Sequence, residues 1–312
     1  MSKEFTHLSL ASAYSFKYGA AHPEQLVERA AKFNMKALAL TDQNNLAGAI
    51  RFAQSCESYG IKPILGINLS FIQKTSKITL LARGGSLSSL YRLVTAINTN
   101  TSDGVLTIDL LERFNQYSSD LIALLGPQSG LNKNLSDRKE AAALSNYQLT
   151  KEHFSKVVIE CVSHLERVGN LRSTTAAGRS LAFAIKNQIP AVITNQVRML
   201  EKSDGPVVDV LDANRKLSFI TSAIIERSNG EAYLKDSQDM AHLADQVARA
   251  AGEVSCKSLL KTTADIAAEC ELSTQGEIGL GGIHLPEPAL FGATTQDQLV
   301  TQLRNKTVSK IN

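Results

Sequence analysis

The sequence predicts an α/β fold in which strands and helices alternate around a barrel. Short β-rich runs alternate with amphipathic helical stretches over most of the 312 residues, which is typical of repeated βα units around a parallel sheet. Most of the β-rich runs are almost continuously apolar, as strands covered on both faces should be. The connections between the predicted elements are short, which favours a barrel.

Seven strands are predicted, at residues 5–10, 36–41, 62–71, 77–82, 120–125, 156–161 and 190–194. The segment HPEQLVERAAKFN between the first two strands places Pro23 in a first helical turn and Leu26, Val27 and Ala30 on one face, which predicts a helix packed on the sheet. Further helices are predicted at 45–58, 86–98, 170–187 and 204–213.

The pattern changes after about residue 235. Two helices, 237–250 and 261–271, precede the segment GEIGLGGIHLPEP, whose glycines and prolines favour a domain edge. We therefore predict a first domain at 1–282, with a barrel to about 220 and a helical extension at about 235–272. Residues 283–312 are predicted to form a linker and, with a helix at 294–305, the start of another domain.

Composition excludes several classes of protein. The apolar runs fall short of the roughly 20 residues that span a bilayer, and the N-terminus lacks a secretory signal, so we expect a cytoplasmic chain with no membrane partner. The four cysteines, Cys56, Cys161, Cys256 and Cys270, have neither zinc-ribbon nor disulfide-framework spacing. A net charge of +3, no Trp and 5% aromatic residues permit a nucleic-acid partner without arguing for one.

Several motifs together closely resemble one family. They are HLSLASAYS, YGAAHPEQLVERA, ALALTDQNNLAGAIRF, GIKPILGINL, ITLLAR with LYRLVTAI, LIALLGPQSG, VVIECVSH, IPAVITNQVRML with DVLDANR, YLKDSQDM and IHLPEP. In order and spacing they resemble the PHP (polymerase and histidinol phosphatase) domain that opens the α subunit of bacterial DNA polymerase III. The resemblance runs from about residue 5 to about 303.

The resemblance implies a fold, a role and partners. The fold is a distorted (β/α)7 TIM-like barrel (PHP fold) with a helical C-terminal extension, and residues 283–312 lead into the polymerase palm. The implied parent is a DNA-directed DNA polymerase acting in replication or translesion synthesis, and GAAHPEQLVERAA and YLKDSQDM look more like the error-prone branch. The implied partners are the rest of the α chain, a proofreading exonuclease or other replication and repair subunits, and DNA through the intact enzyme.

Active PHP hydrolases hold a metal cluster at the C-terminal ends of the strands. The resemblance places nine other residues where the family carries its ligands: Ser9, Ala11, Tyr18, Gln43, Asn68, Lys77, Pro127, Gln196 and Arg198. Ala and Pro offer no side-chain donor, the neutral polar residues bind transition metals poorly, and Lys and Arg repel a cation. We therefore predict no metal, no cofactor and no phosphoesterase or exonuclease activity for this chain, and no rescue by a single restored ligand.

Three residues at family positions, Asp42, His7 and Glu160, still carry side chains that could take part in catalysis or metal binding. Asp42 in TDQNN could act as a base, although an aspartate after a barrel strand more often caps a helix or orders its own loop. His7 and Glu160 could belong to a residual site, although hydrogen-bonded structural roles are more common. His22 is interpreted as a helix-entry residue, and the other histidines, His153, His164, His242 and His284, lack neighbours at ligand spacing.

Three hypotheses follow for function. The first is an inactive PHP domain with a structural or partner-docking role. The alternative is a metal-dependent phosphoesterase or 3'-5' proofreading exonuclease that uses a rearranged ligand set such as His7, Asp42, Glu160 and His164. The third is a free-standing nucleic-acid binding module. In addition, Lys17, Lys77 and Arg198 could converge on the emptied mouth as an anion pocket for sulfate or a DNA phosphate.

Overall fold

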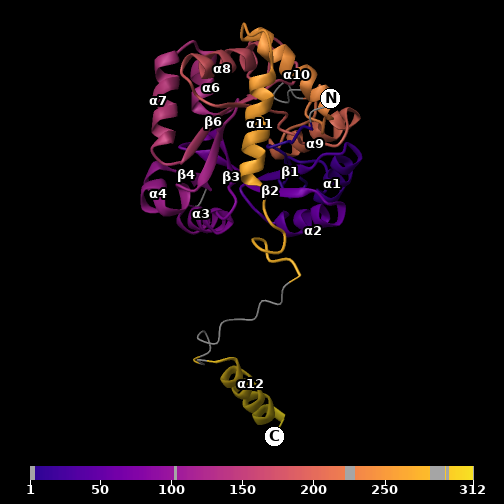
Figure 1. Cartoon of the computed structure of the whole chain (residues 1–312), viewed down its shortest axis with the longest axis vertical. Coiled ribbons are helices and arrows are strands. Elements are labelled where there is room, and N and C mark those ends of the chain that lie inside the picture. Colours follow the sequence, from indigo (N-terminus) through magenta and orange to yellow (C-terminus); the bar gives the residue numbers. More distant parts are fainter. Residues whose placement is uncertain (1–3, 102–103, 222–228, 282–291, 293–294, 312) are drawn as a thin grey trace. The chain divides into compact units, whose positions relative to one another are not determined.

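The computed structural model describes residues 4–101, 104–221, 229–281, 292 and 295–311 (Figure 1). Their strands are β1 (Ala37–Gln43), β2 (Lys62–Phe71), β3 (Gln73–Ala82), β4 (Val105–Leu106), β5 (Leu121–Leu125), β6 (Lys156–Val162) and β7 (Ala191–Thr194). Their helices are α1 (Pro23–Lys32), α2 (Ala49–Tyr59), α3 (Leu87–Asn100), α4 (Ile108–Arg113), α5 (Asn115–Ser118), α6 (Gly130–Ser136), α7 (Glu140–Lys151), α8 (Thr174–Lys186), the 3-10 turn η1 (Lys202–Asp204), α9 (Gly205–Arg215), α10 (Ser237–Ala250), α11 (Lys257–Cys270) and α12 (Gln296–Ile311).

One curled sheet runs in the order β1-β2-β3-β5-β6-β7, with β4 paired to β2. The pairs β1–β2, β5–β6 and β6–β7 are parallel, whereas β3 is antiparallel to both β2 and β5. The predicted α/β class is confirmed, but the expectation of a parallel sheet is wrong at β3. A short hairpin joins β2 to β3, and strands linked by such a turn must be antiparallel.

Residues 7–11 lie between β1, one edge strand of the sheet, and Val197, which follows the other edge strand, β7. On one side the carbonyls of His7 and Leu10 accept from the amides of Ala39 and Thr41, at 3.0 and 2.8 Å. On the other side the Ala11 amide donates to the Val197 carbonyl at 2.8 Å. The strand predicted at 5–10 therefore lies in the right place but is irregular, because its two acceptors stand three residues apart and their β1 donors only two. That extra residue has the effect of a β-bulge.

The barrel interior is apolar towards the N-terminal ends of the strands. Inward-facing side chains pack with three residues of α11 in one buried cluster: Leu8, Ala37, Ala39, Ile64, Leu81, Ile122, Leu124, Val158, Val192, Ile266, Ala267 and Cys270. The predicted helical extension therefore packs on the barrel through α11, whose residues complete this interior. A larger buried cluster lies between the sheet and the surrounding helices.

Most helices begin near the predicted positions, because their apolar spacing is strong. Four helices between residues 108 and 151 were not predicted. The longest of them, α7, buries only Ala143 and Thr150, so its sequence carries little amphipathic signal. None of the helices among the described residues is long and apolar enough to cross a membrane.

The chain divides into two compact units, Met1–Ile278 and Gly279–Asn312. The first holds the barrel with α10 and α11, and the second holds α12. Residues 282–291, which include His284 and most of the predicted linker, lie outside the described residues. The assignment of 283–312 to the start of a palm region stays a prediction.

Candidate functional site: a barrel mouth without metal ligands

The mouth of the barrel is a ring of mainly polar residues above the apolar interior. Side chains alternate across a strand, so each inward row that begins with an apolar residue continues to a polar one near the mouth. Gln43 and Asn68 are paired in the β1–β2 register, and Asn68 is paired with Thr79 of β3. The ring encloses a small pocket of about 20 Å³, room for one or two waters. Its lining is Ser9, Leu10, Ala11, Tyr18, Thr41, Gln43, Asn68, Lys77, Thr79, Gly126, Gln128, Glu160, Gln196 and Val197.

Seven of the nine residues that the resemblance placed at ligand positions line this pocket: Ser9, Ala11, Tyr18, Gln43, Asn68, Lys77 and Gln196. Arg198 lines an adjoining groove instead. Pro127 is buried and is not among the lining residues, although its neighbours Gly126 and Gln128 are. Most of the ligand positions that the motif resemblance identified therefore lie together at the barrel mouth.

The donors around the pocket do not fit a divalent metal. Glu160 is the one carboxylate among the lining residues, and it already accepts from Thr194 Oγ1 at 2.6 Å and Gln196 Nε2 at 3.0 Å. Burial raises the pKa of Glu160 despite these hydrogen bonds. The Asn68 amide donates to Thr79 Oγ1 at 2.8 Å. In the part of the chain that the structure describes, no three His, Cys, Asp or Glu side chains come together as metal ligands could.

Glu160 also limits the space in the mouth. A Cβ added at Gly126 would lie 2.1 Å from Glu160 Oε2 and 2.9 Å from Gln196 Nε2. No side chain can approach that closely, so the glycine leaves the room that the carboxylate occupies. The mouth is thus filled by hydrogen-bonded side chains of the protein itself.

Asp42 holds the loop that follows the first barrel segment. It is buried, and it accepts from the Ser12 amide at 2.7 Å, from Ser12 Oγ at 2.8 Å and from Ser15 Oγ at 2.6 Å. Burial raises its pKa, and the hydrogen bonds from Ser15 and Ser12 offset only part of that effect. Asp42 does not line the pocket, and its contacts are those of a residue that orders a loop.

The rearranged ligand set is not assembled in the structure. His7 Nε2 lies 2.9 Å from the Lys235 carbonyl oxygen and His164 Nε2 lies 2.8 Å from that of Asn195, so each ring donates from Nε2 to the backbone. Of the four proposed ligands, Glu160 alone lines the small pocket, and His164 lines the adjoining groove. Both histidines are buried, and burial is the largest cause of a pKa lowered to about 4 for His7 and about 3 for His164.

Because the pKa values of the two buried histidines, His7 and His164, are lowered, we predict that the fold loses stability in acid. A histidine whose pKa is lowered by folding contributes stability that is present above pH 6.5 and is lost as pH falls towards its folded pKa. For His7 the shift from 6.5 to about 4 corresponds to roughly 3 kcal/mol of unfolding free energy. We expect urea unfolding followed by circular dichroism to show this loss between pH 6.5 and 4, and to show a shallower loss for His7→Phe.

The variant separates this effect from the carboxyl groups. The raised pKa values of Asp42 and Glu160 act in the opposite sense, since protonating them in the folded state adds stability as pH falls. They are common to both proteins and cancel in the comparison. Equal pH slopes for wild type and His7→Phe would contradict the assignment to His7.

The cations of the expected anion pocket do not converge on the mouth as a set. The Arg198 guanidinium donates to Asp212 at 2.7 and 3.1 Å and to the Tyr18 carbonyl at 3.2 and 3.3 Å. It also lies 3.9 Å from the centre of the Tyr18 ring. Lys17 lines neither the pocket nor the groove, and its ammonium lies over the Phe16 ring. Lys77 does face both, so one of the three expected cations is in position.

A larger groove adjoins the pocket, and it was not predicted from the sequence. It has a volume of about 1040 Å³ and shares Tyr18, Gln43, Lys77 and Gln128 with the pocket. The rest of its lining is His164, Leu165, Glu166, Arg167, Asn170, Arg172, Arg198, Asp212, Arg215, Lys216, Asn229 and Ala232. We call it the cationic groove, because six of its residues are Lys or Arg and two are acidic.

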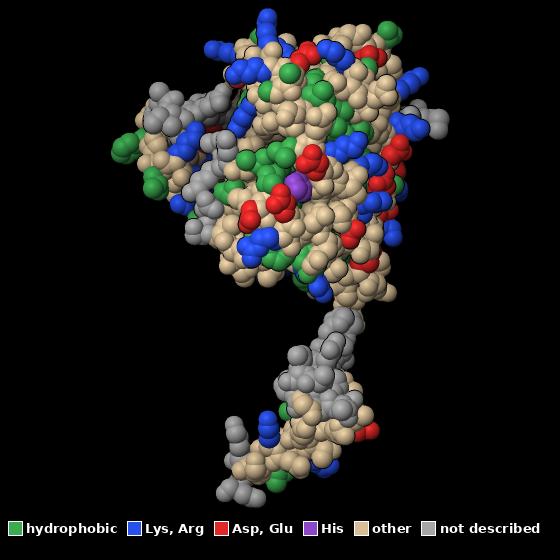
Figure 2. All heavy atoms as spheres, turned by 90° about the vertical axis from the view of Figure 1, so that its left-hand side faces the viewer, with side chains coloured by type: hydrophobic (Ala, Val, Ile, Leu, Met, Phe, Trp, Pro, Cys, Tyr) green, Lys and Arg blue, Asp and Glu red, His purple; other side chains and the backbone are tan. Residues whose placement is uncertain are grey.

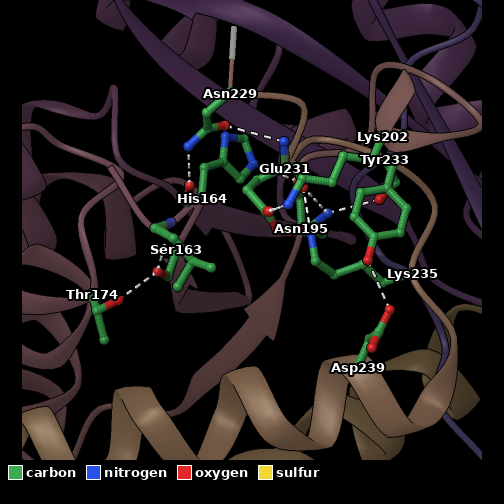
Figure 3. A network of polar contacts seen from close by, with 11 residues as sticks. Ser163, His164, Thr174, Asn195, Lys202, Asn229, Glu231, Tyr233, Lys235 and Asp239 are labelled. Atoms are coloured by element: carbon green, nitrogen blue, oxygen red, sulfur yellow. Dashed lines mark hydrogen bonds and ion pairs between the residues drawn. The ribbon is translucent and has the colours of Figure 1, made fainter. Parts of the chain in front are cut away.

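A polar network with the buried residues Asn195, Glu231 and Lys235 at its centre fixes one wall of the groove (Figure 3). The Asn195 amide donates at 2.8 Å to the carbonyls of Glu231 and Tyr233, and Asn229 donates to the His164 carbonyl at 2.5 Å. The buried Lys235 ammonium lies 3.0 Å from Glu231 Oε2, and Lys202 pairs with Glu231 Oε1. The network anchors residues 229–235 to the ends of β6 and β7.

Comparison with known proteins shows which family this barrel belongs to and which polymerases it is similar to. The model of the PHP domain family matches residues 7–164, which is half of the chain. The α subunit of DNA polymerase III from Buchnera aphidicola is 29% identical over 262 residues, which cover 79% of this chain and 22% of that protein. An error-prone DNA polymerase from Symbiobacterium thermophilum is 29% identical over 259 residues, which cover 76% of this chain and 23% of that protein.

Among solved structures, the chain is similar to a two-domain protein from Bacteroides vulgatus described as containing a predicted PHP-like metal-dependent phosphoesterase. The two are 13% identical with a TM-score of 0.43, over 62% of this chain and 52% of the other. The chain spans about a fifth of the length of the curated relatives it matches. With the family match covering half of its residues, the chain belongs to the PHP domain family.

Proposed function

We propose that this chain is a metal-free, catalytically inactive PHP domain from a bacterial DNA polymerase III α-type polymerase, with a structural or partner-docking role. The observation that carries the proposal is the mouth itself. Seven positions where the family carries ligands line one pocket with Ser, Ala, Tyr, Gln, Asn and Lys, and its one carboxylate is hydrogen-bonded to Thr194 and Gln196.

The chemistry of the mouth explains the loss of activity. A metal-dependent phosphoesterase needs a cation to lower the pKa of a water and to neutralise the developing charge on the phosphate. The Lys77 ammonium stands in the mouth, where it repels a divalent ion. A single restored ligand, such as Ser9→His, should not recruit metal, because affinity depends on several deprotonated donors together.

The test is metal binding and hydrolysis by the purified chain. After incubation with zinc or manganese and removal of free ion, we expect far less than one metal per chain and no rise in melting temperature, since a bound ion would stabilise the fold. We also expect no cleavage of a phosphodiester or of single-stranded DNA above a metal-only control. A PHP phosphoesterase with its full ligand set serves as the positive control. Stoichiometric metal with turnover would favour the rearranged ligand set and defeat the proposal.

The parent polymerase and its setting are part of the proposal. The relatives include DNA polymerase III α subunits and error-prone DNA polymerases at the same identity, so they support both branches alike. The phrases GAAHPEQLVERAA and YLKDSQDM favour the error-prone branch. We place the chain in the cytoplasm, packed against the rest of an α chain, with a proofreading exonuclease or another replication or repair subunit as a further partner.

A further inference from the structure

The cationic groove concentrates positive charge beside the mouth. Its six Lys and Arg residues against two carboxylates give an excess larger than the net charge of +3 of the whole chain. On the face of the molecule shown in Figure 2, by contrast, Lys, Arg, Asp and Glu side chains are interspersed. The groove is therefore a local feature, and the mild overall charge hides it.

Acidic neighbours compensate only part of this charge. Asp212 pairs with both Arg198 and Arg215, so one carboxylate serves two guanidinium groups. Arg172 donates to the neutral Gln196 amide at 3.3 Å, and Lys77 donates to the neutral Ser70 hydroxyl at 3.1 Å. Cations held by neutral partners keep their attraction for an anion.

Exposed apolar side chains lie on the chain segments that also carry residues of the cationic groove. Phe16 is 80% exposed two residues before Tyr18, and Phe219 is 85% exposed three residues after Lys216. Leu165, which lines the groove, is 48% exposed. Exposed aromatic rings are surfaces on which the bases of a nucleic acid can stack.

We infer that the cationic groove binds the phosphodiester backbone of a single-stranded nucleic acid. Arg167, Arg172 and Lys216 contact its phosphates, and Phe219 offers a face on which a base stacks. A positive groove flanked by aromatic rings is the usual means of holding single strands without reading their sequence. The inference goes beyond the proposed function and does not depend on it, because binding here needs neither metal nor hydrolysis.

The size and spread of the groove favour a strand over a free phosphate compound. Its cations come from four separate places: Lys77 on β3, Arg167 and Arg172 after β6, Arg198 after β7, and Arg215 and Lys216 at the end of α9. A volume of about 1040 Å³ lies at the upper limit of small-molecule sites. A chain of phosphates, unlike a single phosphate, offers an anionic group to each of these places.

The experiment measures fluorescence anisotropy of a labelled oligothymidylate with the 312-residue chain in EDTA. The groove variant is Arg167→Glu with Lys216→Glu, and the matched control is Arg113→Glu with Lys151→Glu. All four side chains are exposed, so both variants should fold. We expect the groove variant to bind about tenfold or more weakly and with a shallower salt dependence, while the control binds as wild type. Phe219→Ala should also weaken binding without changing the salt dependence.

Three outcomes would overturn the inference: no binding by wild type at low salt, equal loss in groove and control variants, or complete displacement by pyrophosphate, dTTP or polyglutamate at equal charge concentration. The inference is supported if an unlabelled single strand displaces the probe and pyrophosphate, dTTP and polyglutamate do not. Metal content and hydrolysis are measured separately, so failure here leaves the inactive-domain proposal standing, and an active metal site leaves the groove result interpretable.

Discussion

Glu231→Gln is expected to lower the free energy of unfolding by about 3–5 kcal/mol, because it leaves the ammonium of Lys235 buried without a counter-charge. The side chains of Glu231 and Lys235 are 9% and 5% exposed, and their charged atoms lie 3.0 Å apart. Burial alone would raise the pKa of Glu231, but its hydrogen bonds to Lys202 and Lys235 outweigh burial and lower it. Urea unfolding at pH 7 measures the loss.

Two comparisons make this result specific. Glu201→Gln removes an exposed pair with Arg29, which solvent screens, and should cost far less than Glu231→Gln. Glu231→Leu with Lys235→Met removes both buried charges and should recover much of the loss. Burial lowers the pKa of Lys235, so the deficit of Glu231→Gln should shrink as pH rises and the buried amine becomes neutral. A deficit equal to that of Glu201→Gln would show that the pair is not buried as described.

Asp42→Ala is expected to destabilise the fold by about 3 kcal/mol or more. The substitution leaves the Ser12 amide, the Ser12 hydroxyl and the Ser15 hydroxyl buried without their acceptor, and each unsatisfied group costs about 1–3 kcal/mol. Thermal unfolding and urea unfolding both measure the change. The loop at 12–15 should also become more susceptible to protease.

The controls separate a loop-ordering role from a catalytic one. Ser15→Ala removes one of the three donors and should cost less than Asp42→Ala. Asp109→Ala removes an exposed partner of Arg113 and should cost a few tenths of a kcal/mol, roughly the worth of a helix-surface pair. If Asp42 were a base, a folded Asp42→Asn protein would lose a hydrolytic activity that wild type shows. We expect wild type to show none.

Much of the fold could be predicted because the strands are continuous apolar runs. β2 begins and ends where the sequence predicts, and β5, β6 and β7 lie within one residue of their predicted bounds. Strand direction could not be predicted in this way, since side-chain period is the same in parallel and antiparallel strands. The two-residue β4 is too short to show any period.

The candidate site likewise has one part that could be predicted from the sequence and one part that could not. The positions around the mouth were predicted from a motif resemblance that fixed their order along the chain, and seven of them line the pocket. The cationic groove could not be predicted, because Arg167, Arg172 and Arg215 are separated in sequence and look like ordinary solvated charges. Lys17 was misplaced for a related reason: its φ of 57° belongs to a loop conformation that sequence spacing does not reveal.

The way the barrel is completed bears on the order in which the protein can form. The segment His7–Ala11 leaves the ribosome before any strand, and it can meet β1 early. Its other edge bonds to Val197, which is synthesised only after most of the sheet. Residues 7–11 can therefore complete their hydrogen bonds only after β7 has been synthesised, and chaperones would meet the nascent chain with this edge still open.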